Sequence, residues 1–350
     1  MKYALLLLVF LVACTTPQDS IKVGSVLSST GYASLYGENS QKGIQLAVEE
    51  INAQGGINGR PLEVIFEDDA TNGKTAVTAA TKLIEQDKVS VIIGGSWDLS
   101  VEPIVPIADQ AKVVFITPST GNTEHEKRSS PYLFRTWSSI ESKVYQFKPV
   151  FEKHNFKRVV IFRNGGTWAL AHKTALVRLL NETGGELVAD FEGVQVDGND
   201  FATQIVQAKE LAPDAVFFAV NNGDAVSVMK KFRELDFSPV VFSTDGGMED
   251  AIRRGQIPSA DVREAYLIDS LSDDADFVQK FEKKHGKQPG ITADAAYLAM
   301  KLVADAYRSG ATDGESVRAY LENSGAFDSY GDIKTKDGVY SVINGEREPV

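Results

Sequence analysis

The sequence contains a single cysteine, Cys14, among its 350 residues. One cysteine cannot form a disulfide within the chain, so the folded protein must be stabilised by packing alone. Clusters of basic residues are lacking as well. The formal net charge is −12, and no stripe of Lys and Arg is present that could bind the phosphates of a nucleic acid. We therefore expect no nucleic-acid partner.

Motifs for catalysis, metal binding and cofactor binding are also lacking. The four histidines do not have the spacing of metal ligands, such as H-E-x-x-H. No G-x-x-x-x-G-K-[ST] or G-x-G-x-x-G motif follows a predicted strand. The segment "GGSWD" is not a G-x-S-x-G nucleophile elbow, because Asp98 stands where the last glycine should be. We therefore expect neither an enzyme nor a protein that holds a metal or a cofactor.

The longest apolar run lies at the N-terminus, where Lys2 precedes "YALLLLVFLVA". This run is well short of the about 20 residues that span a bilayer, so it predicts a signal peptide, and no later run is long enough to span. Cys14 directly after "LVA" resembles the lipobox of bacterial lipoproteins, which implies a lipid on its thiol and cleavage before it. We expect a lipoprotein signal peptide at 1–13 and a lipidated Cys14 with a polar tether to residue 20. An ordinary signal peptide cleaved elsewhere is the alternative.

From residue 21, short β-branched runs alternate with stretches whose apolar residues have helical spacing. In the first half, strands are expected at 21–27, 61–69, 89–95 and 112–120, with helices at 38–56, 73–87 and 101–110 between them. The last helix contains Pro103 and Pro106, which we expect in its first turns, where proline is tolerated. This alternation predicts an α/β fold with a doubly wound parallel sheet.

The second half repeats this order of elements. The segments 157–168, 173–193 and 200–224 correspond to the first strands and helices, and "VVFSTDGG" (240–247) is similar to "VVFITPST" (113–120). The matches are too far apart for a solenoid, so they indicate two similar domains, unless α/β sequences resemble each other here by chance. In parallel sheets, ligands bind beyond the carboxyl ends of the strands. Two sheets that face each other would therefore form one binding cleft between two lobes.

The segment "GYASLYGENSQKGIQLAVEEINAQGGINGRPLEVIFEDDA" (31–70) resembles the type I periplasmic binding proteins. The resemblance runs from about residue 21 to the end and is to the branched-chain amino-acid (leucine/isoleucine/valine) substrate-binding group of ABC importers. It implies two Rossmann-like lobes joined by three hinge crossings, near 135–138, 268–270 and 329–333. Lobe 1 would comprise 21–136 and about 270–329, and lobe 2 about 137–269 and about 330–350.

The resemblance also implies a set of ligand-binding residues. In the family, an amino-acid ligand is held by its carboxylate at a helix N-terminus and by its ammonium at an acidic residue. Asp245 matches the acidic residue, although it could be a turn residue before two glycines. The loop that supplies backbone and hydroxyl contacts matches Ser119, Thr120 and Gly121. Tyr36 and Trp168 match the aromatic residues that cover the ligand.

Two positions depart from the family. Asp98 stands where the family has its carboxylate-binding serine, and Asn221 replaces a tyrosine. A ligand carboxylate a few ångströms from Asp98 would be repelled by about 4 kcal/mol at an effective dielectric near 20. Three explanations remain open: Asp98 caps the helix with its side chain turned away, the alignment is shifted so that Ser96 or Ser100 supplies the hydroxyl, or the ligand is not a free amino-acid anion.

Two tryptophans and two arginines could belong either to the binding site or to the structural framework. Trp97 and Trp168 follow glycine-rich strand ends, which favours cleft walls that stack on a planar or cationic ligand, although core positions are the alternative. Arg135 and Arg163 are the cations available for a ligand carboxylate. For both arginines, structural ion pairs are the favoured interpretation.

We therefore expect an extracytoplasmic solute-binding lipoprotein of an ABC importer, located in the periplasm or anchored to the outer face of the cytoplasmic membrane. It would capture a small amino acid or amino-acid-like ligand as a monomer and deliver it to the permease transmembrane subunits, with no cofactor. The alternatives are a ligand-binding sensor, or an importer receptor for a cationic, amide or aromatic compound.

Overall fold

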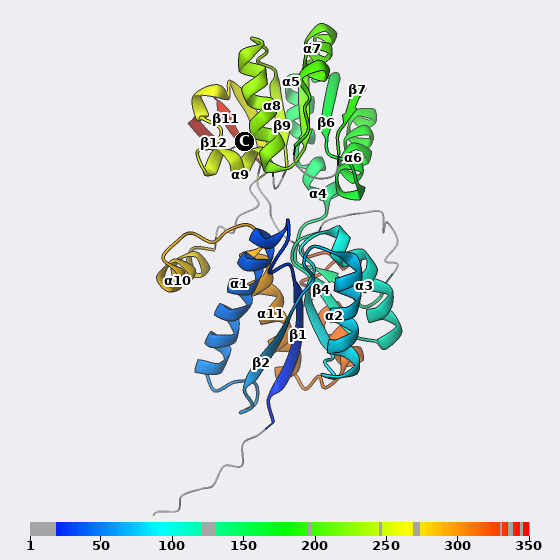
Figure 1. Cartoon of the computed structure of the whole chain (residues 1–350), viewed down its shortest axis with the longest axis vertical. Helices are drawn as coiled ribbons and strands as arrows, with labels where there is room; N and C mark the ends of the chain where they lie inside the picture. The colour runs from blue at the N-terminus through cyan, green and yellow to red at the C-terminus, as the bar shows by residue number, and fades with distance from the viewer. Residues whose placement is uncertain are drawn as a thin grey trace, which may run out of the picture.

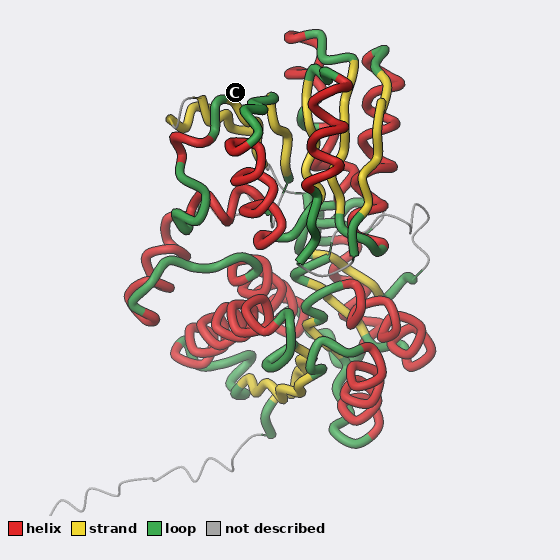
Figure 2. The backbone as a smooth tube through the Cα atoms, turned by 45° about the horizontal axis from the view of Figure 1, so that its top comes forward, coloured by secondary structure: helices red, strands yellow, loops and turns green. Residues whose placement is uncertain are grey.

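The computed structural model describes residues 19–120, 130–194, 198–244, 247–268, 274–329, 331–334, 339–343 and 346–349. Within these residues the strands form two separate sheets, and helices flank the strands in both (Figures 1 and 2). The doubly wound α/β fold with two sheets is as predicted from the sequence. The predicted signal peptide, Cys14, Gly121 and Asp245 lie outside the described residues.

The first sheet has five parallel strands in the order β2-β1-β3-β4-β5. Their bounds are β1 (Ile21–Leu27), β2 (Leu62–Asp68), β3 (Val91–Gly94), β4 (Val114–Thr117) and β5 (Leu133–Arg135). The helices α1 (Ser34–Ala53), α11 (Ala293–Arg308) and α12 (Gly314–Asn323) bury one face of the sheet. The other face is buried by α2 (Gly73–Glu85) and α3 (Asp98–Ala111). Because both faces are covered, the central strands β3 and β4 are buried and apolar almost throughout. We call this unit lobe 1.

The second sheet has seven strands in the order β12-β11-β10-β9-β8-β6-β7, and β11 and β12 run antiparallel to their neighbours. The strands are β6 (Arg158–Arg163), β7 (Glu186–Glu192), β8 (Ala215–Ala219), β9 (Val240–Ser243), β10 (Glu264–Ile268), β11 (Val339–Ile343) and β12 (Glu346–Pro349). One face is covered by α4 (Ile140–Tyr145), α5 (Lys148–His154) and α6 (Thr167–Thr183). The other is covered by α7 (Ala202–Leu211), α8 (Asn222–Glu234) and α9 (Met248–Arg253). We call this unit lobe 2.

The two lobes share one strand order, since β7-β6-β8-β9 in lobe 2 corresponds to β2-β1-β3-β4 in lobe 1. The internal similarity seen in the sequence therefore reflects two similar sheets. The elements change sheet after β5, after β10 and before β11 (Figure 1). Near the first and third of these points, Arg135 forms a bridge with Asp332, and the two buried side chains form an ion pair. The use of the three crossings as hinges stays a prediction.

Helix α3 differs from the expectation at its start. It begins at Asp98, three residues before the predicted 101, because the extended Trp97 is its N-cap and accepts the amides of Ser100 and Val101. Pro103 and Pro106 therefore lie inside the helix, beyond its first turn, and the prediction that they occupy the first turns was wrong. The earlier start moves Asp98 from a loop into the first helical position.

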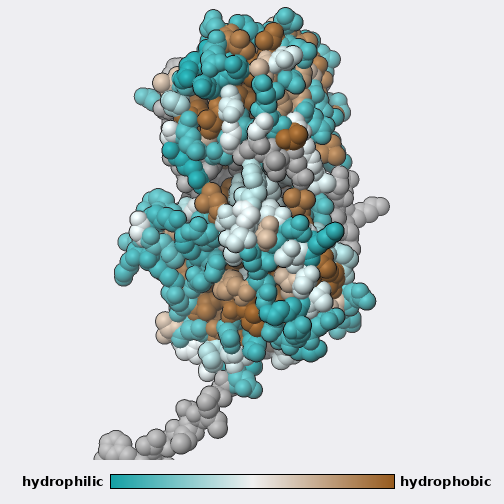
Figure 3. All heavy atoms as spheres, viewed as in Figure 1, coloured by the Kyte–Doolittle hydropathy of each residue, from teal (hydrophilic) through white to brown (hydrophobic). Residues whose placement is uncertain are grey.

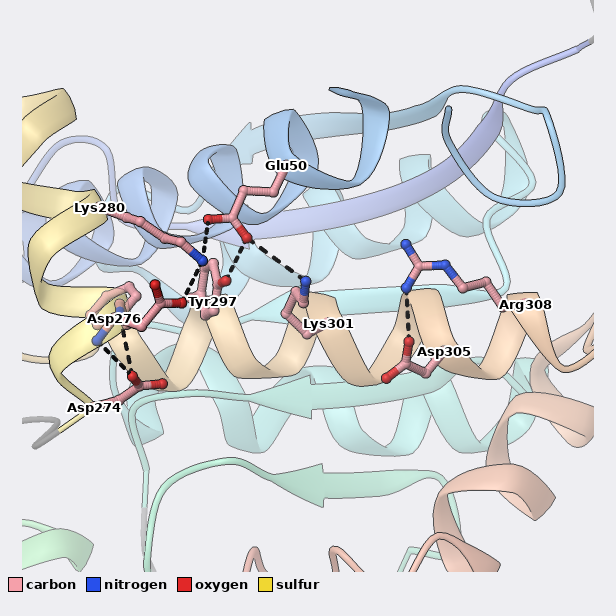
Figure 4. Close-up of polar contacts among 9 residues, drawn as sticks. Glu50, Asp274, Asp276, Lys280, Tyr297, Lys301, Asp305 and Arg308 are labelled. Carbon is pink, nitrogen blue, oxygen red and sulfur yellow. Dashed lines mark hydrogen bonds and ion pairs between the residues drawn. The ribbon is translucent and has the colours of Figure 1, made fainter. Parts of the chain in front are cut away.

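The face of the protein seen in Figure 3 is mostly hydrophilic, with smaller apolar areas. Helix α10 (Ala275–His285) lies at the edge of lobe 1, where Phe277 and Phe281 pack against α1 and α11 and a polar cluster adds further contacts (Figure 4). Glu50 of α1 is its centre. It accepts the hydroxyl of Tyr297 at 2.6 Å, and the Nζ atoms of Lys280 and Lys301 lie 3.4 and 3.8 Å from its carboxylate. Burial and Glu50 together raise the pKa of the Tyr297 hydroxyl.

Replacing Glu50 by glutamine is expected to lower the free energy of unfolding by about 1 kcal/mol, because the cluster is partly exposed and such ion pairs are weak. The measurement is urea unfolding of both proteins. Glu49→Gln is the matched control, since Glu49 is on the same helix and its pair with Lys284 is exposed. An equal decrease in the free energy of unfolding in both variants would show that the cluster around Glu50 stabilises the protein no more than the exposed pair does.

Candidate ligand-binding cleft

A cavity of about 70 Å³ lies between the two lobes, at the carboxyl ends of their parallel strands. Lobe 1 contributes segments that follow β3 and β4, and lobe 2 contributes segments that follow β6 and β8. The lining residues are Tyr36, Trp97, Asp98, Leu99, Ser119, Trp137, Gly165, Gly166, Thr167, Trp168, Asn221, Ile291 and Thr292. Contributions from both lobes to one cavity are what the carboxyl-end rule predicts for two facing sheets.

Three tryptophans form much of the cavity wall, and each is held by neighbouring side chains. Trp97 packs edge-on against Tyr32 and Tyr36, with ring centroids 5.1 and 5.8 Å away. Trp168 packs edge-on against the buried His172 at 4.5 Å. The rings are therefore fixed before any ligand arrives, so little side-chain entropy is lost when one binds.

His172, which packs against Trp168, is itself fixed by two polar contacts. Its Nδ1 lies 2.9 Å from the carbonyl oxygen of Trp168, and its Nε2 lies 2.6 Å from Oγ1 of Thr244.

The side chain of Trp137 is nearly buried, and Nζ of Lys143 lies 4.0 Å from its ring centroid. Lys143 itself does not line the cavity.

Asp98 places a carboxylate in the cavity wall and joins the two lobes. Its Oδ1 accepts the hydroxyl of Thr120, and its Oδ2 lies 3.3 Å from the hydroxyl oxygen of Thr167 in lobe 2, which can donate either to it or to Oε1 of Glu102 at 3.0 Å. The residue is only 8% exposed. The explanation that Asp98 caps α3 is wrong, because Trp97 is the N-cap and its carbonyl oxygen already accepts the amides of Ser100 and Val101.

The two arginines considered from the sequence do not line the cavity. Arg135 pairs with Asp332, and Nε of Arg163 lies 2.6 Å from Oδ1 of Asp190. Nη2 of Arg163 also lies 2.6 Å from Glu192. The favoured interpretation, structural ion pairs for both arginines, agrees with these contacts. Among the lining residues in the described part of the chain, Asp98 is the one charged side chain.

Most of the site residues expected from the sequence come together in the structure. Those that line the cavity are Tyr36, Trp97, Asp98, Ser119, Trp168 and Asn221. Thr120 is buried beside them and is bonded to Asp98. Ser96 is fully buried, and its hydroxyl accepts the amide of Ser28 at 2.9 Å, so it holds the strand ends of lobe 1 together. It is not among the lining residues.

Sequence reasoning missed Leu99, Trp137, Ile291 and Thr292, which also line the cavity, and did not single out Gly165, Gly166 and Thr167 as site residues. Trp137 lies in the crossing after β5, and Thr292 directly precedes α11 in a left-handed conformation (φ 74°). The hydroxyl of Thr292 donates to the carbonyl oxygen of Tyr36 at 3.1 Å and accepts from Ser40 at 2.8 Å. The position of Trp137 at a predicted crossing was the one available signal.

No group of three or more His, Cys, Asp or Glu side chains within the described ranges is placed to hold a metal ion. In the same part of the chain, no helix combines the length and the apolar character needed to cross a membrane.

Comparison with known proteins places this arrangement among solute receptors. The family model described as "Periplasmic binding protein" matches residues 20–339. The "Amino acid binding protein" of Pseudomonas aeruginosa is 25% identical over 91% of this chain and 89% of its own length. The "Leucine-, isoleucine-, valine-, threonine-, and alanine-binding protein" of the same organism is 25% identical, with 91% and 88% covered.

A solved structure is similar over nearly the whole chain. It is the branched-chain amino acid transporter substrate-binding protein LivJ of Streptococcus pneumoniae in complex with isoleucine, which is 26% identical. The match has a TM-score of 0.78 and covers 95% of this chain and 99% of that chain. The similarity therefore extends through both lobes.

Proposed function

This chain belongs to the periplasmic binding protein family, and from that premise we propose that it captures a small amino acid or amino-acid-like solute for an ABC importer. It is a solute-binding protein and not an enzyme, and an exported or periplasmic location follows from the family. The solved relative is described as a transporter component, which favours transport over the sensor alternative.

One observation carries the proposal: residues of both lobes line the same cavity, and the hydroxyl oxygen of Thr167 in lobe 2 lies 3.0 Å from Glu102 and 3.3 Å from Asp98, both in α3 of lobe 1. A ligand in the cavity would contact both lobes only when they are together. Such a ligand shifts the equilibrium between open and closed forms by its preference for the closed one. Micromolar capture needs a binding free energy of only about −8 kcal/mol.

The finer points of the proposal concern hinges, site residues and anchoring. The crossings after β5, after β10 and before β11 would serve as hinges between the two lobes. Lobe 1 would comprise 21–136 and about 270–329, and lobe 2 would comprise about 137–269 and about 330–350. The ligand-binding set would include Asp245 and Gly121 together with the cavity residues. A lipid on Cys14 would tether the protein, as a monomer, close to the permease subunits that receive the solute.

The proposal is tested by calorimetric titration and thermal unfolding against amino acids, amides, amines and small aromatic acids. A ligand at 100 times its Kd should stabilise the protein by about 2.7 kcal/mol. Trp168→Ala should weaken its binding at least tenfold, since buried aromatic anchors dominate such sites. Leu170→Ala, at a 39% exposed position two residues along the same helix, is the matched control. Absence of binding across the whole panel would refute the proposed function.

A further inference from the structure

The electrostatic character of the cavity is unlike that expected for the carboxylate end of an amino acid. Asp98 is the charged lining side chain in the described part of the chain. Its Oδ1 accepts the hydroxyl of Thr120, and its Oδ2 lies 3.3 Å from the hydroxyl oxygen of Thr167, which also lies 3.0 Å from Oε1 of Glu102. An anion placed against Asp98 is repelled, and burial strengthens that repulsion because the local dielectric is low.

Aromatic rings flank the same carboxylate. Trp97 directly precedes Asp98, and Trp168 directly follows Thr167, the residue that contacts Asp98 across the cleft. Both rings line the cavity. The faces of tryptophan rings attract cations, and cages of aromatic side chains are used to bind quaternary ammonium groups. The carboxylate and the two rings therefore favour the same kind of group.

The third tryptophan has a different environment. Nζ of the buried Lys143 already lies over Trp137, at 4.0 Å from the ring centroid. A second cation against that ring would be repelled by the first. We therefore place the positive group of a ligand between Trp97 and Trp168, and its neutral part toward Trp137 and Ile291.

We propose that this cavity binds a small organic cation, an amine or a quaternary ammonium compound, with its positive group against Asp98 and without a carboxylate there. The inference rests on the proposed capture of a solute for an ABC importer, and it replaces the amino-acid ligand of that proposal by a cationic one. It also accounts for the departure at Asp98, since an acidic residue at this position excludes a ligand anion and neutralises a ligand cation.

The test compares leucine, leucinamide and choline by calorimetric titration of the whole protein. Leucine and leucinamide share a side chain and an ammonium group, but the amide replaces the carboxylate. The wild-type protein is expected to bind leucinamide or choline at least tenfold more tightly than leucine. Asp98→Asn should weaken the binding of these cations at least tenfold, and Asp98→Ser should narrow or reverse the preference over leucine.

Asp109→Asn is the matched control, because it removes the same charge from the far end of α3, where Asp109 accepts the hydroxyl of Ser130. Its ligand preference should stay within twofold of wild type, and thermal unfolding of each ligand-free variant checks its fold. Leucine bound as tightly as leucinamide and choline, or a preference that Asp98→Asn leaves unchanged, overturns the inference while the proposed function stands. If none of the three probes nor any member of the wider panel binds, both fail.

Discussion

Replacing Gly43 by valine is expected to lower the free energy of unfolding by about 3 kcal/mol or more, a large share of the stability of a domain. Gly43 lies in α1 where this helix meets α11, and a Cβ atom added there would lie 1.9 Å from the carbonyl oxygen of Ala293. The obstacle is backbone, so no side chain can move aside. The two helices must separate, and the buried apolar face between them loses its packing.

The same variant should also weaken ligand binding. Ala293 follows Thr292, which lines the cavity and bonds the backbone of Tyr36. A shift of α11 away from α1 therefore displaces one wall of the cavity. Urea unfolding and calorimetric titration measure the two effects.

Glu49→Val is the control for Gly43→Val, because it places the same side chain at an exposed position of α1. It should cost less than about 1 kcal/mol, mainly through the lower helix propensity of valine. If Gly43→Val unfolds at the same urea concentration as this control, the close approach of α1 and α11 does not exist in solution.

Arg135→Met is expected to cost about 3–5 kcal/mol, because it leaves a buried carboxylate without its ion-pair partner. Arg135 and Asp332 are 3% and 7% exposed. Burial raises the pKa of Asp332, and Arg135 opposes that rise, so its removal raises the pKa further. The folded variant then binds a proton more tightly than the unfolded chain does, and its stability falls as the pH rises through that pKa. The loss should therefore be smaller in acid.

A second substitution separates charge burial from packing. Arg135→Met combined with Asp332→Leu removes both charges and should recover much of the lost stability, since buried ion pairs are often replaceable by apolar residues. Arg158→Met is the control at an exposed pair with Glu186 and should cost less than about 1 kcal/mol. If the double variant is as unstable as Arg135→Met, the unpaired charge is not the cause. Urea unfolding across a range of pH measures all three.

The parts of the site predicted from the sequence are those that obey a local rule. Trp97, Trp168 and Asn221 each follow a strand of a parallel sheet, and the carboxyl-end rule places them at one edge. Ser96 obeys the same rule but is turned inward, because its hydroxyl accepts the amide of Ser28, which directly follows the neighbouring strand β1. Sequence position places a residue at the edge but does not fix which way its side chain points.

The remainder of the site depends on how the lobes are placed. Trp137 follows β5, a three-residue strand that was not predicted from the sequence, and Thr292 reaches the cavity from the segment before α11. The contact between Thr167 and Asp98 joins residues far apart in the sequence, and no spacing predicts it. The start of α3 was misplaced for a local reason, since Trp97 as N-cap is not among the residue types that usually mark a helix start.

All three tryptophans of the chain line the cavity between the lobes. The intrinsic fluorescence of this protein excited at the indole band therefore arises from the cleft, with no indole emitter elsewhere to dilute it. Entry of a solute, or separation of the lobes, changes the polarity around every emitter at once. An unlabelled sample thus carries its own optical reporter of occupancy, suited to following capture and release on the millisecond scale by rapid mixing.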